Sequence, residues 1–383
     1  MHLPLTNDVN GSYAPYDKAE DIYKTILDEL KDIAPRSVRQ PYRKLQYQDF
    51  INLGDMEKWE RYANSLRLRL AMRVATQGAL QAEGRAVIKE ILENPTDYPL
   101  VEEQGNNIFI VNQKSGQLNF TAGHGLGDWV TNRLASGAII DRMLGHGNYD
   151  MTSSDPLSGV YVKGEDDPRI LLNYNPVSIT NRETGQLDEH RYLGTDLTVA
   201  DELTEYYSAQ AQDEVNTANK GFSQITQRGF FWENDKFDML IMASPEIHFL
   251  KAEAYAMGYG VAQDMAKAEE EFKTAVSQSI ALYYYYDSIG SGENCRRYDA
   301  PTDKEIADFA NARWNSTAYV DKLDAIITQK WLHFGFLVSR EAWSDIRRTG
   351  YPSGLVFPEV SGTIQCAEPL EIPQHGSKLQ SVL

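Results

Sequence analysis

The stretch Trp59–Arg73, WERYANSLRLRLAMR, decides the fold class of this chain, because it reads as an apolar helix unusually rich in arginine. On a helical wheel one stripe collects Trp59, Tyr62, Ala63, Leu66, Leu70 and Val74. Leu68 and Ala71 project from the other side, so we expect neighbours to cover the helix on two faces. A helix of this kind lies inside a larger helical assembly.

The arginines of this helix need partners. Arg73 falls within the apolar arc and Arg69 lies at its edge. An unpaired guanidinium in such surroundings is costly, so each requires a carboxylate or several carbonyl groups. We therefore expect Arg67, Arg69 and Arg73 to tie neighbouring helices together, and we do not expect them to form an open basic face.

Length and composition describe a folded protein with a large core: 383 residues, 42% of them hydrophobic and 24% charged. The 22 tyrosines suit either recognition surfaces or packing between helices, and we expect packing for most of them. The formal net charge is −18 and there is no basic tail. A nucleic-acid partner is therefore not expected, because neutralising phosphates requires clustered Lys and Arg.

The sequence shows no pattern typical of a metal or redox site. Its two cysteines, Cys295 and Cys366, form no CxxC pair, so one disulfide and two free thiols remain equally open. The seven histidines are scattered, and His248 is expected to be packed within a helix. We expect no cofactor and no bound metal. No apolar run reaches 18 residues, and residues 1–12 show no signal peptide.

Helical periodicity marks two parts of the chain as a scaffold, at about 14–94 and 244–352. The helices expected there cover 16–33, closed by Pro35, then 59–73, 81–93, 264–286, and 319–348 with a break near Gly335. Another begins at Ser244-Pro245-Glu246, which reads as a capping pattern, and stops at glycines near 258. The pairs resemble tetratricopeptide hairpins. The expected fold class is all-α, with few short strands.

Residues 95–243 read as a long, irregular, loop-rich insertion. Glycine, Asn, Asp and aromatic residues rise there, and periodicity survives only in short helices such as 129–144. The run GHGLGDW at 123–129 is not a phosphate loop, since no strand precedes it and no lysine follows it. Long irregular segments in a folded chain are commonly functional, so we expect the ligand to bind here.

Four blocks in this order resemble the SusD/RagB family of outer-membrane proteins. They are WERYANSLRLRLAMR at 59–73, DPRI at 167–170, SPEIHFLKAEAYAMGYG at 244–260, and ITQKWLHFG with EAWSDIRRTGYP at 327–352. IIDRML at 139–144 and APYDKAEDIYKTILDEL at 14–30 are similar to helices that flank those blocks in the family. The resemblance covers about 14–352 and implies one SusD/RagB-type domain over 1–383, expected to be incomplete at its N-terminus.

The resemblance implies an all-α lipoprotein of the Bacteroidetes cell surface. Such a protein captures glycans, or sometimes peptides, for a SusC-like TonB-dependent outer-membrane transporter, its expected partner. Family members begin with a secretion signal and a lipid-bearing cysteine and usually end in an "R.pYP..E" segment; we expect neither in this sequence. Membrane attachment is accordingly expected only through a lipid anchor that this chain does not contain. The implied localisation is the outer face of the outer membrane.

The family motifs place a set of residues in the scaffold. This set contains Trp59, Asn64, Arg67, Arg69, Arg73, Asp167, Arg169, Glu253, Lys330, Trp331, Trp343, Arg347 and Arg348. Asp345 with Arg347 and Arg348 resembles a catalytic acid beside anion-binding arginines, but a structural ion-pair network at a helix end is the favoured interpretation. With 55 acidic residues, carboxylate pairs alone say little about glycoside hydrolysis. We expect no catalytic residue.

Sugar binding requires an aromatic face for the apolar side of a pyranose, with amides, carboxylates or guanidinium groups for its hydroxyls. Three aromatic residues outside the expected helical scaffold are selected: Trp129, Tyr161 and Trp232. They are the ligand-binding candidates. The favoured function is non-catalytic glycan capture. The alternatives are a tetratricopeptide-type protein-interaction scaffold, a peptide-binding member of the same family and, less favoured, a glycoside hydrolase.

Overall fold

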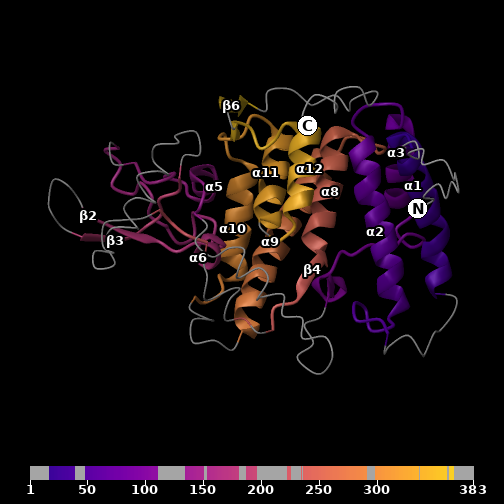
Figure 1. Ribbon diagram of the computed structural model, residues 1–383, viewed down its shortest axis with the longest axis horizontal. Helices are drawn as coiled ribbons and strands as arrows, with labels where there is room; N and C mark the ends of the chain where they lie inside the picture. The colour runs from indigo at the N-terminus through magenta and orange to yellow at the C-terminus, as the bar shows by residue number, and fades with distance from the viewer. Residues whose placement is uncertain are drawn as a thin grey trace, which may run out of the picture. The chain divides into compact units, whose positions relative to one another are not determined.

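A computed structural model of the chain is mainly helical, which confirms the all-α class with few short strands (Figure 1). The structure describes residues 17–38, 48–110, 134–150, 153–180, 187–195, 222–225, 234, 236–290, 298–335, 337–359 and 362–365. The chain forms two compact units, described separately below. Unit 1 comprises Met1–Ile110 and Leu240–Ala275, and unit 2 comprises Val111–Met239 and Val276–Leu383.

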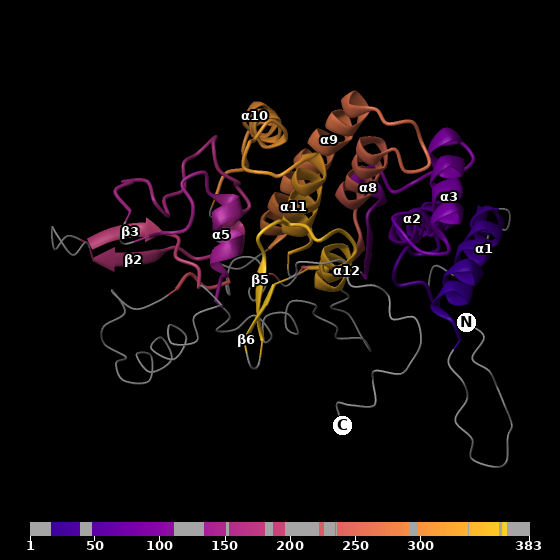
Figure 2. The ribbon, with the colours of Figure 1, turned by 90° about the horizontal axis from the view of Figure 1, so that it is seen from above.

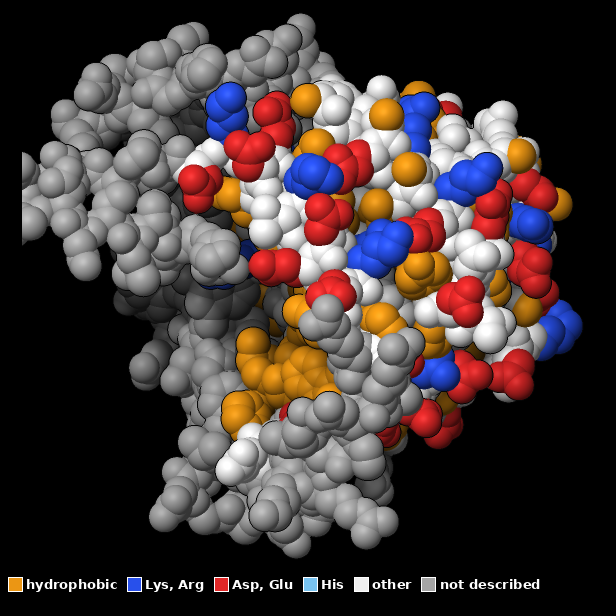
Figure 3. Space-filling view, turned by 90° about the vertical axis from the view of Figure 1, so that its right-hand side faces the viewer, with side chains coloured by type: hydrophobic (Ala, Val, Ile, Leu, Met, Phe, Trp, Pro, Cys, Tyr) orange, Lys and Arg blue, Asp and Glu red, His pale blue; other side chains and the backbone are white. Residues whose placement is uncertain are grey.

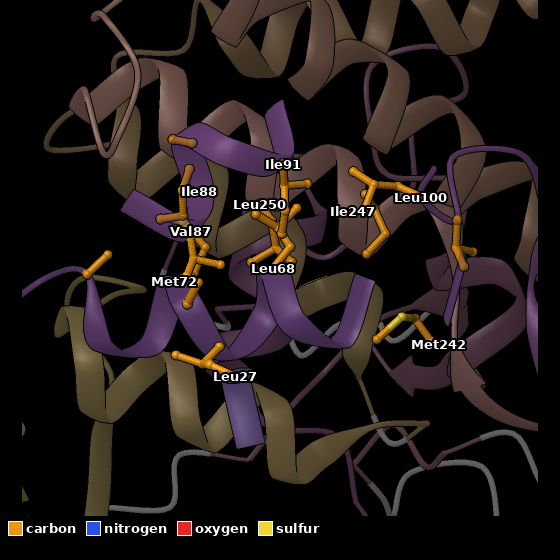
Figure 4. Close-up of a cluster of buried hydrophobic side chains, with 14 of the residues drawn as sticks. Leu27, Leu68, Met72, Val87, Ile88, Ile91, Leu100, Met242, Ile247 and Leu250 are labelled. Atoms are coloured by element: carbon orange, nitrogen blue, oxygen red, sulfur yellow. The ribbon is translucent and has the colours of Figure 1, made fainter. Parts of the chain in front are cut away.

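Unit 1 is a set of packed helices around one apolar core. Its helices are α1 (Ala19–Val38), α2 (Met56–Val74), α3 (Gln81–Glu93), α8 (Ser244–Met257) and the first part of α9 (Met265–Ile289), with the 3-10 turn η2 (Gln104–Asn106). Strand β1 (Ile108–Ile110) pairs with β4 (Met239–Met242). Figure 4 shows the core, where Leu68 and Met72 of α2 meet side chains of α1, α3 and α8.

Helix α2 confirms the helix expected at 59–73 and extends it by three residues at the start. Asp55 caps it, accepting hydrogen bonds from the backbone N–H groups of Glu57 and Lys58. The helix is covered on two faces, but Leu68 and Ala71 lie on the fully buried one, whereas the Trp59 stripe is largely half-buried. The stripe predicted as the main packing face is thus the less buried of the two, because a helical wheel shows the spacing of apolar residues and not how deeply they are buried.

One predicted helix end and one predicted cap were wrong, although α8 begins at Ser244 as expected. Pro35 does not close the first helix, because α1 continues to Val38. A proline has a φ close to helical values, so the turn that follows it can continue. Ser244 is not the cap of α8 either, because Ala243 holds that position and no side chain of α8 caps it. The Ser244 backbone N–H donates instead to Asn107 Oδ1 at 2.8 Å, a partner far away in the sequence.

Unit 2 combines helices with the loop-rich segment. It contains α5 (Gly137–Met143), α6 (Ile170–Asn173), the rest of α9, α10 (Asp303–Trp314), α11 (Lys322–Phe334) and α12 (Ser339–Thr349). Its antiparallel strand pairs are β2 (Val177–Thr180) with β3 (Leu187–Arg191) and β5 (Val356–Glu359) with β6 (Gly362–Gln365). Figures 1 and 2 both show α11 beside α9, where the Tyr283 hydroxyl donates to the His333 carbonyl.

The predicted break near Gly335 is confirmed, since this residue ends α11 with a φ of +43°. The sequence interpretation missed α10. Its N-terminal capping box could have been read from the sequence, since Thr302 is followed three residues later by Glu305. In the structure the Thr302 side chain accepts from the Glu305 backbone N–H, and the Glu305 side chain accepts from the Thr302 backbone N–H. In the part of the chain that the structure describes, no helix is long and apolar enough to cross a membrane.

Candidate functional site

Arg67 and Arg69, two of the motif arginines of α2, lie in ion pairs with neighbouring helices of unit 1. Arg69 is buried, and two N–H groups of its guanidinium donate to the two carboxylate oxygens of Glu246 in α8, at 2.5 Å each. Arg67 donates to Glu90 of α3 at 2.7 Å. Burial opposes ionisation of Glu90, but hydrogen bonds from Lys31, Arg67 and Tyr98 outweigh it and lower the pKa of Glu90 to about 2. Both side chains are buried, which separates their guanidinium groups from a ligand at the surface.

The DPRI block forms the buried centre of unit 2. Arg169 is 0% exposed and holds both carboxylate oxygens of Asp167, at 2.9 and 2.5 Å. It also donates to Ser279 of α9 and Gln329 of α11. Arg169 thus joins the loop-rich segment to two scaffold helices, which is the position of an anchor and not of a ligand contact.

Next to this anchor, His333 is excluded as a general base by its surroundings. Burial and then the nearby charges of Arg169 and Lys330 lower the pKa of His333 to about 3. The ring is therefore neutral at ordinary pH, and Ser279 Oγ lies 3.0 Å from His333 Nδ1. The ring belongs to the same buried network as Arg169 and has no exposure to solvent that would let substrate reach it.

Asp345 is not a catalytic acid. Burial opposes its ionisation, but Lys330 and Arg348, each 2.8 Å from its carboxylate, lower the pKa of Asp345 to about 2. A carboxyl group that stays ionised has no proton to deliver near neutral pH. The expected ion-pair network at the end of this helix thus includes Asp345 and Arg348. Arg347 is exposed and lies outside it.

The remaining motif residues differ in burial. Asn64 and Glu253 are buried, whereas Arg73 and Trp331 are half-buried. Trp343 is 45% exposed, although the motif suggested a scaffold role for it. Exposure of this indole is a tertiary property that the motif alone did not reveal.

Of the three aromatic candidates, Tyr161 lies within the described residues, whereas Trp129 and Trp232 lie outside them. The Tyr161 ring is half-buried at a shallow hollow of unit 2 lined by Tyr161, Lys163, Asp166, Pro168, Glu305 and Phe309. The enclosed volume is about 10 Å³, the space of about one water molecule. A ligand here would lie on the surface and would not be enclosed. Burial raises the pKa of Tyr161 to about 12, so its hydroxyl remains protonated.

Asp166 holds the loops on both sides of Tyr161. One carboxylate oxygen accepts from the Gly145 N–H at 2.6 Å, and the other accepts from the Val162 N–H at 2.7 Å. Burial raises the pKa of Asp166, because the backbone hydrogen bonds only partly offset the loss of solvent. Lys163 and Glu305 form an ion pair at 3.3 Å beside the hollow. The hollow thus combines an aromatic face with both donors and acceptors, the combination that a neutral sugar requires.

Unit 1 contains a second hollow, of different chemistry. It has a volume of about 580 Å³ and is lined by Leu30, Ile33, Phe50, Met56, Trp59 and Tyr62, among others. Figure 3 faces the side of the molecule that carries α1, and hydrophobic side chains gather there in one area. Among the described lining residues the carboxylate is that of Asp49, which already accepts from the Trp59 indole and from three backbone N–H groups. A sugar hydroxyl would find few polar partners here.

Neither hollow contains a set of groups suited to catalysis or metal binding. Among the described residues, no group of three or more His, Cys, Asp or Glu side chains could hold a metal ion. Cys295 and Cys366 lie outside the described residues. His146 contacts Asp155 at 2.8 Å, and both side chains are partly exposed. The nearby Ser153 hydroxyl accepts from the Asp155 backbone N–H, and none of the described contacts joins it to His146 as a nucleophile would require.

The fold and these surfaces define a class: a mainly helical scaffold, built on helical hairpins, that presents shallow surface sites. A family model described as "Starch-binding associating with outer membrane" matches residues 2–366. The chain therefore belongs to the SusD-like family, as the sequence motifs indicated. A search of curated proteins finds no match.

Solved structures agree with this assignment at the level of the fold. A SusD homolog from Parabacteroides distasonis shares 22% identity with a TM-score of 0.59, over 89% of this chain and 62% of its own. A SusD homolog from Bacteroides fragilis has 19% identity and a TM-score of 0.62, over 89% and 66%. A Bacteroidetes SusD-like protein has 19% identity and a TM-score of 0.58, over 94% and 70%. The chain thus spans less than two thirds of the first of these relatives.

Proposed function

We propose that this protein captures glycans at the outer face of the outer membrane and passes them to a SusC-like TonB-dependent transporter, without chemical conversion. The single observation that carries the proposal is the Tyr161 hollow. It offers an aromatic face, the ammonium of Lys163 and the carboxylate of Glu305 on loops held by Asp166. The family's description as starch-binding and outer-membrane-associated supports the ligand class and the location.

The proposed mechanism is reversible surface binding. The sugar ring stacks on Tyr161, and its hydroxyls exchange water for Lys163 and Glu305. A shallow site gives weak affinity, so delivery depends on holding the ligand beside the transporter at a high effective concentration. Trp129 and Trp232 are proposed as further stacking residues. The networks of Asp345 and His333 hold those groups in protonation states unsuited to acid or base catalysis, which supports binding without turnover.

The test is calorimetric titration of the whole chain with maltoheptaose and with neutral xylo- and manno-oligosaccharides. Tyr161→Ala removes one stacking ring and should weaken oligosaccharide binding roughly fivefold to tenfold. Trp129→Ala and Trp232→Ala should lower the affinity by a similar or smaller factor. Tyr285→Ala is the matched control, since Tyr285 is an exposed tyrosine on α9 away from the hollow. Unchanged affinity in all three site variants, or release of reducing ends, would reject the proposal.

A second candidate function is docking of a peptide or protein, which the apolar hollow beside Trp59 favours. Its lining suits apolar side chains and offers little to a sugar. Binding of peptides but of no glycan, lost in Phe50→Ala and retained in Tyr161→Ala, would favour this function over glycan capture.

A further inference from the structure

The outer face of α12 carries a ladder of one indole between two guanidinium groups. Arg340, Trp343 and Arg347 are spaced i, i+3 and i+7 and project on the same side of the helix, and all three are exposed. The opposite side, with Ala342 and Ile346, is buried. We call Arg340, Trp343 and Arg347 the α12 ladder.

The arginines of the ladder are not used by the fold. Arg348, one residue along, donates to Asp345 within the buried network. By contrast, Arg340 and Arg347 have no ion-pair or hydrogen-bond partner for their side chains among the residues that the structure describes. In a chain of net charge −18 with many more acidic than basic residues, two adjacent unpaired guanidinium groups form an unusual local surface.

The spacing suits an extended ligand that runs along the helix. At 1.5 Å per residue, Arg340 and Arg347 are separated by about 10 Å along the axis, and the Trp343 indole lies between them, within about one turn of each. The ring offers a flat apolar face, and each guanidinium offers a planar fork that matches a carboxylate with two hydrogen bonds.

The hydrogen-bonding chemistry of the ladder selects the charge of its ligand. A guanidinium carries five N–H donors and no acceptor, and the indole N–H is a donor only. The nearby Ser344 hydroxyl already donates to the Arg340 carbonyl. A neutral sugar needs acceptors as well as donors, which the Tyr161 hollow provides and the ladder lacks. A sugar whose hydroxymethyl group is replaced by a carboxylate matches the ladder instead.

We propose that the α12 ladder is a binding subsite for an oligosaccharide that contains uronic acid residues. The sugar ring stacks on Trp343, while carboxylates on the same or neighbouring sugars pair with Arg340 and Arg347. This inference rests on the proposed glycan capture and adds an acidic ligand class and a second place of binding. Carboxylates on a polysaccharide are favoured over phosphates, because the indole between the forks needs a flat apolar ligand face.

The experiment is calorimetric titration of the whole chain with octagalacturonate at low salt, and with its fully methyl-esterified form as the neutral counterpart. Arg347→Gln should weaken octagalacturonate binding at least fivefold and reduce its salt dependence. Trp343→Ala should weaken it severalfold. Lys18→Gln is the matched control, since it also removes one exposed positive charge, and it should change the affinity by less than twofold.

Arg347→Lys separates charge from shape. It keeps the positive charge but loses the fork, so it should recover only part of the lost affinity. Circular dichroism should be unchanged in the Arg340 and Arg347 variants, because among the described residues these two side chains make no hydrogen bond or ion pair.

Three outcomes would overturn the subsite. They are wild-type affinity in Arg340→Gln/Arg347→Gln, equal binding of the acidic and esterified forms, and binding of anionic phospholipid vesicles with no binding of octagalacturonate. If neutral glycans bind through Tyr161 while the ladder variants leave octagalacturonate affinity unchanged, the subsite is wrong and the proposed function stands. If no glycan of either kind binds, the proposed function fails and the subsite fails with it.

Discussion

Arg69 of α2 and Glu246 of α8 are separated by 177 positions in the chain, yet they meet through two parallel 2.5 Å hydrogen bonds in a buried setting. Moving both charges out of water is costly. The pair offsets that cost because the planar guanidinium donates to both oxygens of the carboxylate at once. The pair therefore specifies how α2 packs on α8. Removing one member deprives the other charge of its two-pronged partner in a buried setting.

Glu246→Ala should lower the free energy of unfolding by about 3–5 kcal/mol, the usual cost of an unpaired buried charge. Urea titration followed by circular dichroism measures this cost. Glu270→Ala, an exposed glutamate on α9, is the control and should stay within about 0.5 kcal/mol. The double variant Arg69→Met/Glu246→Leu should recover much of the loss, and a double variant no better than Glu246→Ala would contradict this account.

Gly84→Ala should destabilise the protein although alanine is the better helix former. A Cβ at position 84 of α3 would lie 2.7 Å from the Ala71 carbonyl oxygen and 2.8 Å from Val74 Cγ2. The overpacking should cost about 1–3 kcal/mol, more than the propensity gain of about 1 kcal/mol. Thermal unfolding measures it. Gly105→Ala, where no atom lies within 4 Å, should be close to neutral; equal effects at both positions would refute the close-packing argument.

His333 should make stability depend on pH below neutrality. The pKa of His333 is about 3 in the folded state against 6.5 for a free ring. Between these two pH values the ring is protonated in the unfolded chain and neutral in the folded one. This stability is therefore fully present above pH 6.5 and is lost as pH falls towards 3, at up to about 1.4 kcal/mol per pH unit. Urea titrations from pH 7.5 to 4.5 should show this slope, and His333→Asn should reduce it.

The control for this pH dependence is His146→Asn. The hydrogen bond to Asp155 raises the pKa of exposed His146, so the stability that it contributes is present below pH 6.5 and is lost as pH rises through its folded pKa. Its removal should leave the acid-side slope in place. A slope that survives in His333→Asn would show that other groups control acid unfolding.

Asp166→Ala should weaken glycan binding through the position of Tyr161. The change removes the acceptor of the Gly145 and Val162 backbone N–H groups, two part-buried hydrogen bonds worth about 0.5–1.5 kcal/mol each. We expect a loss of maltoheptaose affinity comparable to that of Tyr161→Ala. Asp155→Ala, at a partly exposed contact with His146 in the same loops, should have a smaller effect. Full affinity in Asp166→Ala would show that the loops need no such support.

Much of the scaffold was predictable because helical periodicity is a local property. The apolar spacing in 59–73 and 81–93 located α2 and α3, and glycine at position 335 located the break before α12. The errors arose where distant contacts decided the outcome. Ser244 looked like a cap, but Ala243 holds the cap position, and the Ser244 backbone N–H donates to Asn107, which no sequence spacing connects to α8. Helix α10 was missed even though Thr302 and Glu305 carried a readable local signal.

The candidate site was only partly predictable. Tyr161 was selected because it is aromatic and outside the helices, and this reasoning could not find Lys163, Glu305 or the supporting Asp166, which come together only in the folded chain. The α12 ladder was hidden for a related reason. The motif around Trp343 resembled scaffold sequence, and only burial distinguishes the outward Trp343 and Arg347 from the inward Asp345 and Arg348.

The sequence by itself determined the helices, the family and the need of the buried arginines for partners. These follow from side-chain spacing and from the cost of an unpaired charge, both of which are independent of distant contacts. Only the tertiary structure decided which carboxylate each arginine meets and which aromatic rings reach solvent. Those outcomes depend on how separate helices pack, since burial is a property of the assembled fold and not of any one segment.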